Sequence, residues 1–199
     1  MYSLTLTKKS EIKVKKSRFI AILKNCYSEK EFKSWLSQTK KDFYDASHVC
    51  WAYRIYRKSR LNEFSSDSGE PRGTAGKPML KILKQNNLIQ ITAVVARYFG
   101  GSKLGKKGLI DAYELSVKNL IDKSNLVEWV DMQYYNVICP MKYCGNLSNC
   151  ISTLNVEIVE DRSSINLDWI IKVKFELINV LRIKIKNITK GEGKLIKYD

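Results

Sequence analysis

The stretch LIQITAVVARYFGGSKLGKKG, residues 88–108, says most about how this chain folds. Its first part, residues 88–99, is almost continuously apolar or β-branched and lacks the alternation of a strand with one wet face. Such a run is typical of a central strand that is covered on both sides. Glycines follow, and residues 109–124 then place their apolar side chains on one helical stripe. The stretch predicts a central strand, a glycine loop and an amphipathic helix, in that order.

Strands and helices also alternate upstream of this stretch. Residues 17–26 and 48–56 have the two-residue period of strands. Between them, Ser28 opens a capping-box pattern that predicts the start of a helix. Pro78 predicts the first turn of a short helix, where its missing N–H costs nothing. These elements predict an α/β domain over residues 1–124.

The pattern changes after residue 124. The remaining chain reads as strand, helix, strand, strand, helix and a weak last strand, which is the order of the ferredoxin-like split βαβ motif. The first of these strands is predicted over residues 126–139 and the last within the tail 194–199. The sequence therefore predicts a mixed α/β (α+β) protein with two domains, residues 1–124 and 125–199.

The charge is uneven along the chain. Residues 1–124 hold 25 Lys and Arg against 11 Asp and Glu, whereas residues 125–199 hold 10 against 9. Lysines that merely keep a protein in solution would be spread evenly, so the first part is predicted to meet a polyanion. No apolar run approaches the roughly 20 residues of a membrane span, and no secretory signal is visible. We expect a cytoplasmic protein without a membrane partner.

Cysteine and histidine usage argues against a metal or disulfide framework. The five cysteines are odd in number and form no CxxC pair, and His48 is the one histidine. A zinc ribbon or a disulfide scaffold needs a different spacing. Buried reduced thiols are therefore predicted, and no metal or cofactor is expected.

The glycine loop at residues 100–108 resembles a phosphate-binding loop but lacks one essential part. Gly100, Gly105 and Lys106 fit the pattern GxxxxGK[ST], whereas Lys107 stands where a Ser or Thr hydroxyl should bind magnesium. This substitution disfavours nucleotide hydrolysis. Backbone N–H groups freed by glycine, a helix N-terminus and lysines still favour anion binding. A tight connection with merely solvated lysines stays open as the simpler alternative.

A second glycine-rich segment, SSDSGEPRGTAGKP at residues 65–78, is too polar for a core. Its Arg72 and Lys77 would favour an anion, but Asp67 and Glu70 would oppose one unless they are paired. We predict that these carboxylates pair with Arg72 or Arg97. A polar site that adds His48 and uses a carboxylate as metal ligand or general base remains the alternative.

Three motifs resemble the signature of the IMPACT/YigZ family: HVCWAYR at 48–54, SDSGEPRGTAGKP at 66–78 and RYFGGSKLG at 97–105. The resemblance implies an N-terminal α/β domain with the βαβ fold of several ribosomal proteins and of domain four of elongation factor G. It also implies a ferredoxin-like C-terminal domain. Eukaryotic relatives regulate translation by binding the co-activator of an amino-acid-starvation kinase, and bacterial relatives are thought to bind nucleic acid or the ribosome. The family has no established catalytic residue.

The chain departs from the family pattern in ways that change its charge. Lys106 and Lys107 stand where relatives usually have neutral loop residues, which strengthens the polyanion hypothesis. Asp111 stands where relatives usually have Arg, so the positive charge of this helix is lower than in those relatives. Val49 replaces the second of two paired histidines, so a metal-binding or catalytic pair with His48 is disfavoured.

Together these observations predict a non-catalytic protein that binds RNA, preferably ribosomal RNA, and regulates translation. The alternatives are an enzyme acting on a nucleotide or phosphate substrate through the loop at 100–108, and a regulator that binds a protein through its C-terminal domain. The predicted phosphate contacts are Arg54, Arg72, Lys77, Arg97, Lys103, Lys106 and Lys107. Close approach of the backbone to phosphate is predicted at Gly73, Gly76, Gly100, Gly101, Gly105 and Gly108.

Overall fold

In the computed structural model of this chain, the structure describes residues 1–57, 60–122 and 126–198. The chain divides into two compact units, Met1–Trp129 and Val130–Asp199. We call them the first and second units and describe each by itself. The first unit ends at Trp129, five residues beyond the predicted limit of the first domain.

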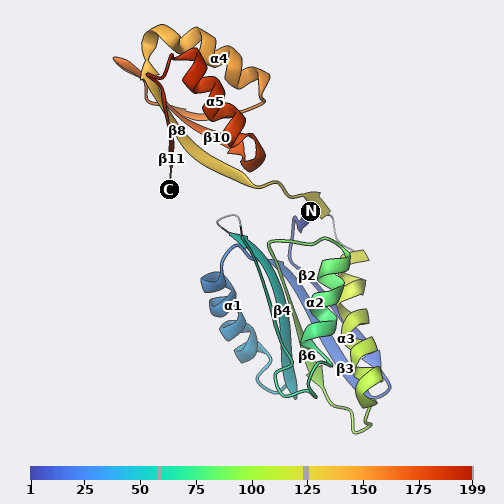
Figure 1. The fold of residues 1–199 in the computed structure, drawn as a ribbon. Coiled ribbons are helices and arrows are strands. Elements are labelled where there is room, and N and C mark those ends of the chain that lie inside the picture. The colour runs from blue at the N-terminus through green and yellow to red at the C-terminus, as the bar shows by residue number, and fades with distance from the viewer. Residues whose placement is uncertain (58–59, 123–125, 199) are drawn as a thin grey trace. The chain divides into compact units, whose positions relative to one another are not determined.

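A five-stranded sheet forms the centre of the first unit (Figure 1). All neighbouring strands in it are antiparallel. Its strands, in order across the sheet, are β2 (Lys8–Val14), β3 (Ser17–Asn25), β6 (Ile91–Tyr98), β4 (His48–Arg57) and β5 (Arg60–Ser66). The predicted central strand, β6, lies in the middle, and its side chains are buried up to Arg97.

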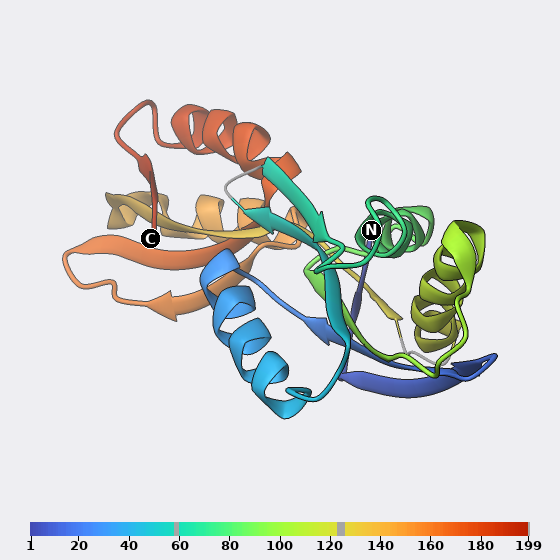
Figure 2. The same ribbon diagram turned by 90° about the horizontal axis from the view of Figure 1, so that it is seen from below.

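Helices cover both faces of this sheet, which is why β6 has no polar face. Figure 2 shows α1 (Glu29–Asp42) on one face and α2 (Gly76–Gln85) with α3 (Gly105–Asp122) on the other. The predicted N-cap of α1 is present, because Ser28 Oγ accepts a hydrogen bond of 3.1 Å from the Glu31 N–H. The Glu31 carboxylate bonds the Tyr27 N–H instead of the N–H of Ser28.

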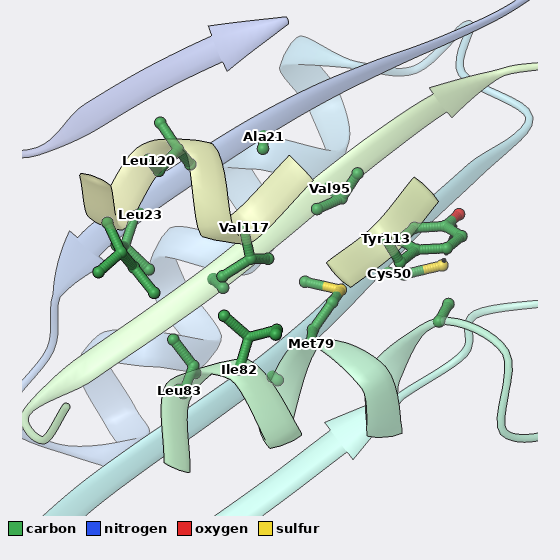
Figure 3. Packing of buried hydrophobic residues seen from close by; sticks show 14 of the residues in the cluster. Ala21, Leu23, Cys50, Met79, Ile82, Leu83, Val95, Tyr113, Val117 and Leu120 are labelled. Atoms are coloured by element: carbon green, nitrogen blue, oxygen red, sulfur yellow. Dashed lines mark hydrogen bonds between the residues drawn. The ribbon is translucent and has the colours of Figure 1, made fainter. Parts of the chain in front are cut away.

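The larger hydrophobic core lies between the sheet and the pair α2 and α3 (Figure 3). Met79, Ile82 and Leu83 come from α2, and Tyr113 and Val117 come from α3. The ring of Tyr113 packs edge-on against Phe19 of β3, with 5.3 Å between ring centroids. A smaller core under α1 gathers Phe32, Trp51 and Tyr53, which are buried or nearly so.

One predicted strand is wrong, because residues 126–139 form two strands in different units. The short strand β7 (Leu126–Glu128) pairs antiparallel with β1 (Tyr2–Leu4) in the first unit. The strand β8 (Met132–Pro140) belongs to the second unit. The first part of the predicted strand therefore pairs with the start of the chain, far away in the sequence, and does not join the sheet of the second unit.

The second unit has the ferredoxin-like topology. Its four strands lie in the order β11-β8-β10-β9 and are antiparallel throughout. Helices follow β8 and β10, as the split βαβ motif requires. After β8, the elements are α4 (Cys144–Thr153), β9 (Glu157–Asp161), β10 (Asn166–Lys174), α5 (Ile178–Ile188) and β11 (Lys194–Lys197). Across the described residues of both units, no helix has the length and apolar character needed to cross a bilayer.

Candidate functional site

The candidate site lies at one end of the sheet in the first unit, on the face that α2 and α3 cover. His48 at the start of β4 and Arg97 near the end of β6 are direct cross-strand partners, so their side chains leave the sheet on the same face. A pocket of about 480 Å³ opens there. Its lining residues are His48, Glu70, Pro71, Arg97, Phe99, Lys103, Leu104, Gly105, Lys106 and Leu109.

The pocket brings together two segments that are distant in the sequence. Glu70 and Pro71 come from the segment at 65–78, while Lys103 and Lys106 come from the glycine loop. Strand ends supply the wall between them. The two glycine-rich segments therefore share one concave surface.

A buried ion pair lies in the wall of this pocket. Glu70 and Arg97 are only 7% and 5% exposed, and Arg97 Nη1 donates to Glu70 Oε1 at 2.7 Å. The Tyr113 hydroxyl donates to the same oxygen at 2.9 Å. The Glu70–Arg97 pair agrees with the prediction that the carboxylates of this segment pair with Arg72 or Arg97. It also removes Arg97 from the set of free cations, because its charge is already neutralised.

The remaining nitrogens of Arg97 are less well satisfied. Nη2 donates to Ser17 Oγ at 3.3 Å, and the guanidinium carbon lies 5.5 Å from the ring centroids of both Phe19 and Phe99. Buried Nε finds no hydrogen-bond partner in the part of the chain that the structure describes. A buried donor of this kind is rare in folded proteins and usually points to a missing partner.

His48 is held in one orientation by the segment at 65–78. Its Nδ1 lies 3.1 Å from the Ser68 carbonyl oxygen, and because a carbonyl only accepts, Nδ1 carries the proton. In the neutral imidazole, Nε2 is then the acceptor. Ser68 and Gly69 reach this position with positive φ angles of 44° and 91°. A side chain on Gly69 would meet the imidazole at 3.1 Å.

Asp67 organises the backbone of this segment and caps α2. Its carboxylate accepts hydrogen bonds from the N–H groups of Gly73, Ala75 and Gly76, at 2.8 to 3.0 Å. Burial alone would raise the pKa of this carboxyl, but these three bonds and the charge of Lys77 outweigh burial and lower it. The predicted pairing of Asp67 with an arginine is therefore wrong, and its oxygens are already engaged by the backbone.

Of the glycines predicted to approach phosphate, Gly73 and Gly76 already donate their N–H groups to Asp67. Gly76 and Gly100 also pack closely against the chain itself. A Cβ on Gly100 would lie 1.7 Å from the Lys16 carbonyl oxygen, and one on Gly76 would lie 2.7 Å from the Ser66 nitrogen. Gly73, Gly101 and Gly105 instead have positive φ and face open space. Gly108 lies within the first turn of α3, near Leu104.

Arg54 is a structural residue, contrary to the prediction that it contacts phosphate. It is 9% exposed, and its Nε forms a 2.7 Å ion pair with Glu63 of the neighbouring strand. Nη1 donates to the Leu88 carbonyl at 2.8 Å. Its charge is neutralised by Glu63 and its Nη1 donates to the backbone, so a phosphate would have to break this arrangement to bind it.

Five of the predicted cations remain exposed and form no ion pair with any residue that the structure describes. Two of them, Lys103 and Lys106, line the pocket. Lys107 lies outside it and lines a separate hollow with Lys15 and Asp111. The five are Arg72, Lys77, Lys103, Lys106 and Lys107.

The helix α3 begins at this pocket with its N-terminus uncapped. Its first turn, which starts at Gly105, contains no acidic residue. Within residues 1–57, 60–122 and 126–198, no side chain accepts a hydrogen bond from the N–H groups of residues 105–108. The N-termini of α1 and α2 are both capped by side chains. The partial positive charge of α3 is therefore left for another acceptor.

The described residues of the site include neither an activated nucleophile nor a cluster of metal ligands. Burial raises the pKa of Cys50 to about 12, so its thiol stays protonated at neutral pH. Its Sγ lies 2.9 Å from the Asp67 carbonyl oxygen and 3.3 Å from the Tyr113 hydroxyl. Among the described residues, no three His, Cys, Asp or Glu side chains gather as metal ligands would.

Sequence reasoning missed the apolar wall of the pocket. Phe99, which the sequence places in an apolar run expected to be covered on both sides, is 48% exposed and lines the pocket together with Leu104 and Leu109. Tyr113 was placed on the apolar stripe of its helix, and its role in holding Glu70 was not foreseen. The hydroxyl on that otherwise apolar stripe was the available signal, since a buried hydroxyl needs a partner.

Comparisons with known proteins place the chain in a family. Residues 15–121 match the Impact N-terminal domain. The IMPACT family member YvyE of Bacillus subtilis is 34% identical over 183 residues, which cover 92% of this chain and 84% of that protein. An IMPACT family member of Haemophilus influenzae is 29% identical over 94% of this chain and 90% of that protein.

A solved structure agrees with the fold of the whole chain. The crystal structure of a hypothetical protein superposes with a TM-score of 0.69 and 25% identity, over all of this chain and 97% of the other. The domain match spans the strands and loops that build the pocket, and the full-length match includes the second unit. The chain belongs to the IMPACT family.

Proposed function

We propose that this protein binds RNA through the sugar–phosphate backbone and acts, without catalysis, in the regulation of translation in the cytoplasm. The observation that carries the proposal is the set of five exposed, unpaired cations on the two glycine-rich segments. Two of them, Lys103 and Lys106, line the pocket, where an uncapped helix N-terminus adds positive potential. The uneven charge of the chain supports the same surface, because the excess of basic residues lies almost wholly within residues 1–124.

The proposal has a quantitative consequence for salt dependence. Phosphate contacts made by Lys and Arg release counterions, so the affinity falls as salt rises. If all five cations contact a duplex, the slope of log K against log salt is about −4 to −5, and about −3.5 on a single strand. Such contacts position a protein without reading bases, so sequence preference is expected to be weak.

The connection with translation comes from the family. Membership is established over most of the chain, and the resemblance implies that eukaryotic relatives regulate translation. We therefore propose that the RNA belongs to the translation machinery, with ribosomal RNA as the first candidate. The unit that carries the exposed cations is also the one that matches the Impact N-terminal domain.

Ribosome co-sedimentation of matched variants tests the proposal. The test variant changes Lys103, Lys106 and Lys107 to Ala, which removes three charges from the loop. The control changes Lys33, Lys40 and Lys41 to Ala, which removes three exposed charges from α1 on the opposite face of the sheet. We expect the loop variant to lose at least about tenfold in affinity and the control less than about twofold. Equal co-sedimentation of both variants, or a flat salt response, would remove the proposal.

A protein partner of the second unit is a second candidate function. The edge strand β9 is exposed along its whole length, and Ile158 and Val159 lie among its acidic residues. An unpaired edge of this kind can accept an extended peptide as an added strand, and its charge favours a basic one. A partner that stays bound after nuclease treatment and at high salt would support this candidate, because contacts to phosphate survive neither.

A further inference from the structure

The pocket at the end of the sheet is lined by two chemically different sets of residues. One set, which we call the apolar wall, is Pro71, Phe99, Leu104 and Leu109. The other set is polar and includes His48, Lys103 and Lys106, with the N-terminus of α3 beginning at Gly105. A volume of about 480 Å³ lies within the range of small-molecule sites. An apolar surface facing a few convergent polar groups is also what such sites have in common.

The charge at the pocket is positive once internal pairing is counted. Glu70 and Arg97 neutralise each other through their 2.7 Å contact. Lys103 and Lys106 keep their full charges, since neither forms an ion pair with a described residue. The helix N-terminus adds a partial positive charge. The net charge of the lining therefore calls for a ligand with about two negative charges.

Two sets of donors around the pocket lack acceptors. One is the row of N–H groups in the first turn of α3, which no described side chain caps. The other is Nε of Arg97, on a side chain that is 94% buried and lines the pocket. An anion in the pocket would satisfy the oriented N–H groups at the start of α3. Nε of Arg97 has almost no accessible surface, so a ligand would reach it only after the guanidinium turns. In the neutral tautomer that donates from Nδ1 to the Ser68 carbonyl, Nε2 of His48 is an acceptor and suits a hydroxyl on the same ligand.

We propose that this pocket binds a phosphate monoester whose organic part packs on the apolar wall, up to about the size of a mononucleotide. The two charges of the monoester match Lys103 and Lys106, whereas an internal phosphodiester carries one charge and has chain on both sides. This inference goes beyond RNA binding through exposed cations, because it concerns a concave pocket and a terminal phosphate. The same chemistry could come from a free metabolite or from the phosphorylated end of an RNA.

Calorimetric titration of the full chain with adenosine 5′-monophosphate tests the inference, with adenosine as the probe that lacks phosphate. We expect saturable binding of the monophosphate below about 1 mM and none of adenosine. Lys106→Ala should weaken the binding about tenfold, while Lys107→Ala, its neighbour outside the pocket, should change it less than about twofold. No saturation at about 10 mM, or equal losses in both lysine variants, would overturn the proposal.

His48→Gln supplies an independent readout, because it keeps a polar side chain but moves the acceptor. We expect about a fivefold loss for adenosine 5′-monophosphate and a smaller loss for methyl phosphate, which has no hydroxyl to donate. Equal losses for the two probes would overturn the role given to Nε2. If this variant fails to fold, the exposed Lys106 and Lys107 variants still decide the proposal.

The outcome can be separated from that of RNA binding. Binding of the monophosphate by a chain that does not bind RNA supports the pocket and removes the RNA proposal. RNA binding without saturable monophosphate binding overturns the pocket alone. Oligoribonucleotides that differ only in a 5′-phosphate or a 5′-hydroxyl distinguish the two sources. Tighter binding of the phosphorylated oligonucleotide than of the free monophosphate supports an RNA end as the ligand, and the reverse supports a metabolite.

Discussion

Arg97 and Glu70 form an ion pair with almost no exposure to water, so the loss of either partner leaves a buried charge without compensation. We expect Arg97→Leu to lower the free energy of unfolding by about 3–5 kcal/mol. The double change with Glu70→Leu should cost less than the sum of the single changes. Urea unfolding of the two single variants and the double variant measures this coupling. If the losses in unfolding free energy are additive, the two side chains have no coupling energy and the contact does not stabilise the fold.

Gly100 and Gly101 are adjacent, but they are glycines for different physical reasons. A methyl group on Gly100 would overlap the Lys16 carbonyl, whereas Gly101 has φ of +85° and open space around it. We expect Gly100→Ala to cost about 3 kcal/mol through overpacking, and Gly101→Ala about 1 kcal/mol through left-handed strain. Thermal unfolding of the two variants compares them. A larger loss of stability in Gly101→Ala than in Gly100→Ala would show that the backbone at Lys16 moves to accommodate the added methyl group.

The sequence identified the charged residues but only one of their pairings, because a pair between a loop carboxylate and Arg97 was predicted and the Arg54–Glu63 pair was not. Lys103, Lys106 and Lys107 were predicted as loop cations and are exposed. Arg54 and Arg97 were predicted in the same role and are buried in ion pairs. Their acidic partners lie 9 and 27 residues away along the chain. Strand pairing and loop conformation bring each pair together, and a single sequence does not show either.

At the element scale, Asp67 serves as the cap of α2 from a position eight residues before the helix's own N-cap residue, Ala75. We expect Asp67→Asn to lower the free energy of unfolding by about 1–2 kcal/mol at about pH 7. The folded pKa of Asp67 lies below its usual value of 3.8. Its contribution is therefore present above that value and is lost as the pH falls through the folded pKa.

The pH dependence is the specific test of this cap. Free energies of unfolding of the wild type and Asp67→Asn should differ at about pH 7 and converge as the pH falls below 3.8 and through the lower folded pKa of Asp67. Ser28→Ala, which removes the cap of α1, serves as the control, because a serine hydroxyl does not titrate in this range. A constant difference between wild type and Asp67→Asn would exclude the charged cap as its cause.

Elements with a strong apolar signal were predictable, and polar edge elements were not. β6 was evident from its unbroken apolar run, because helices cover both its faces. β2 and β5 lie at the two edges of the sheet and mix charged with apolar residues, and neither was predicted. Their pairing with β3 and β4 makes them strands, so tertiary context decided what local propensity left open.

At the scale of the whole molecule, the two units are expected to fold independently, with RNA binding confined to the first. A chain of residues 1–129 should unfold cooperatively and keep the salt slope of the full protein. A chain of residues 130–199 should fold and bind no RNA. Urea unfolding and RNA titrations of both test this. A slope that halves in the shorter chain would assign part of the contact to the second unit.

The position of the unit boundary gives a sharper version of this test. A chain of residues 1–124 lacks β7 and leaves β1 without its antiparallel partner, whereas residues 1–129 keep this pair. It also lacks Trp129, whose ring packs against Tyr56. We expect the shorter chain to be less stable by about 2 kcal/mol or more, because ladder hydrogen bonds and an aromatic contact are lost. Equal unfolding midpoints in urea would show that β7 is dispensable.

The folds of the two units were predicted from different features of the sequence. The motifs at 48–54, 66–78 and 97–105 led to the family, and the order of elements led to the ferredoxin-like second unit. The pocket itself was only partly predictable. Its two loops were singled out, but its apolar lining depends on how the loop between β6 and α3 places Phe99 and Leu104, and periodicity does not encode that.

Pairing of β1 with β7 makes the backbone enter and leave the first unit at the same place. Tyr2 and Glu128 are opposite each other in an antiparallel ladder, so their Cα atoms are about 5 Å apart. Such geometry suits grafting: residues 1–129 could be spliced into a surface turn of a carrier protein without stretching either junction. The same arrangement should allow the first unit to be cyclised head to tail, or circularly permuted with new termini at another exposed turn.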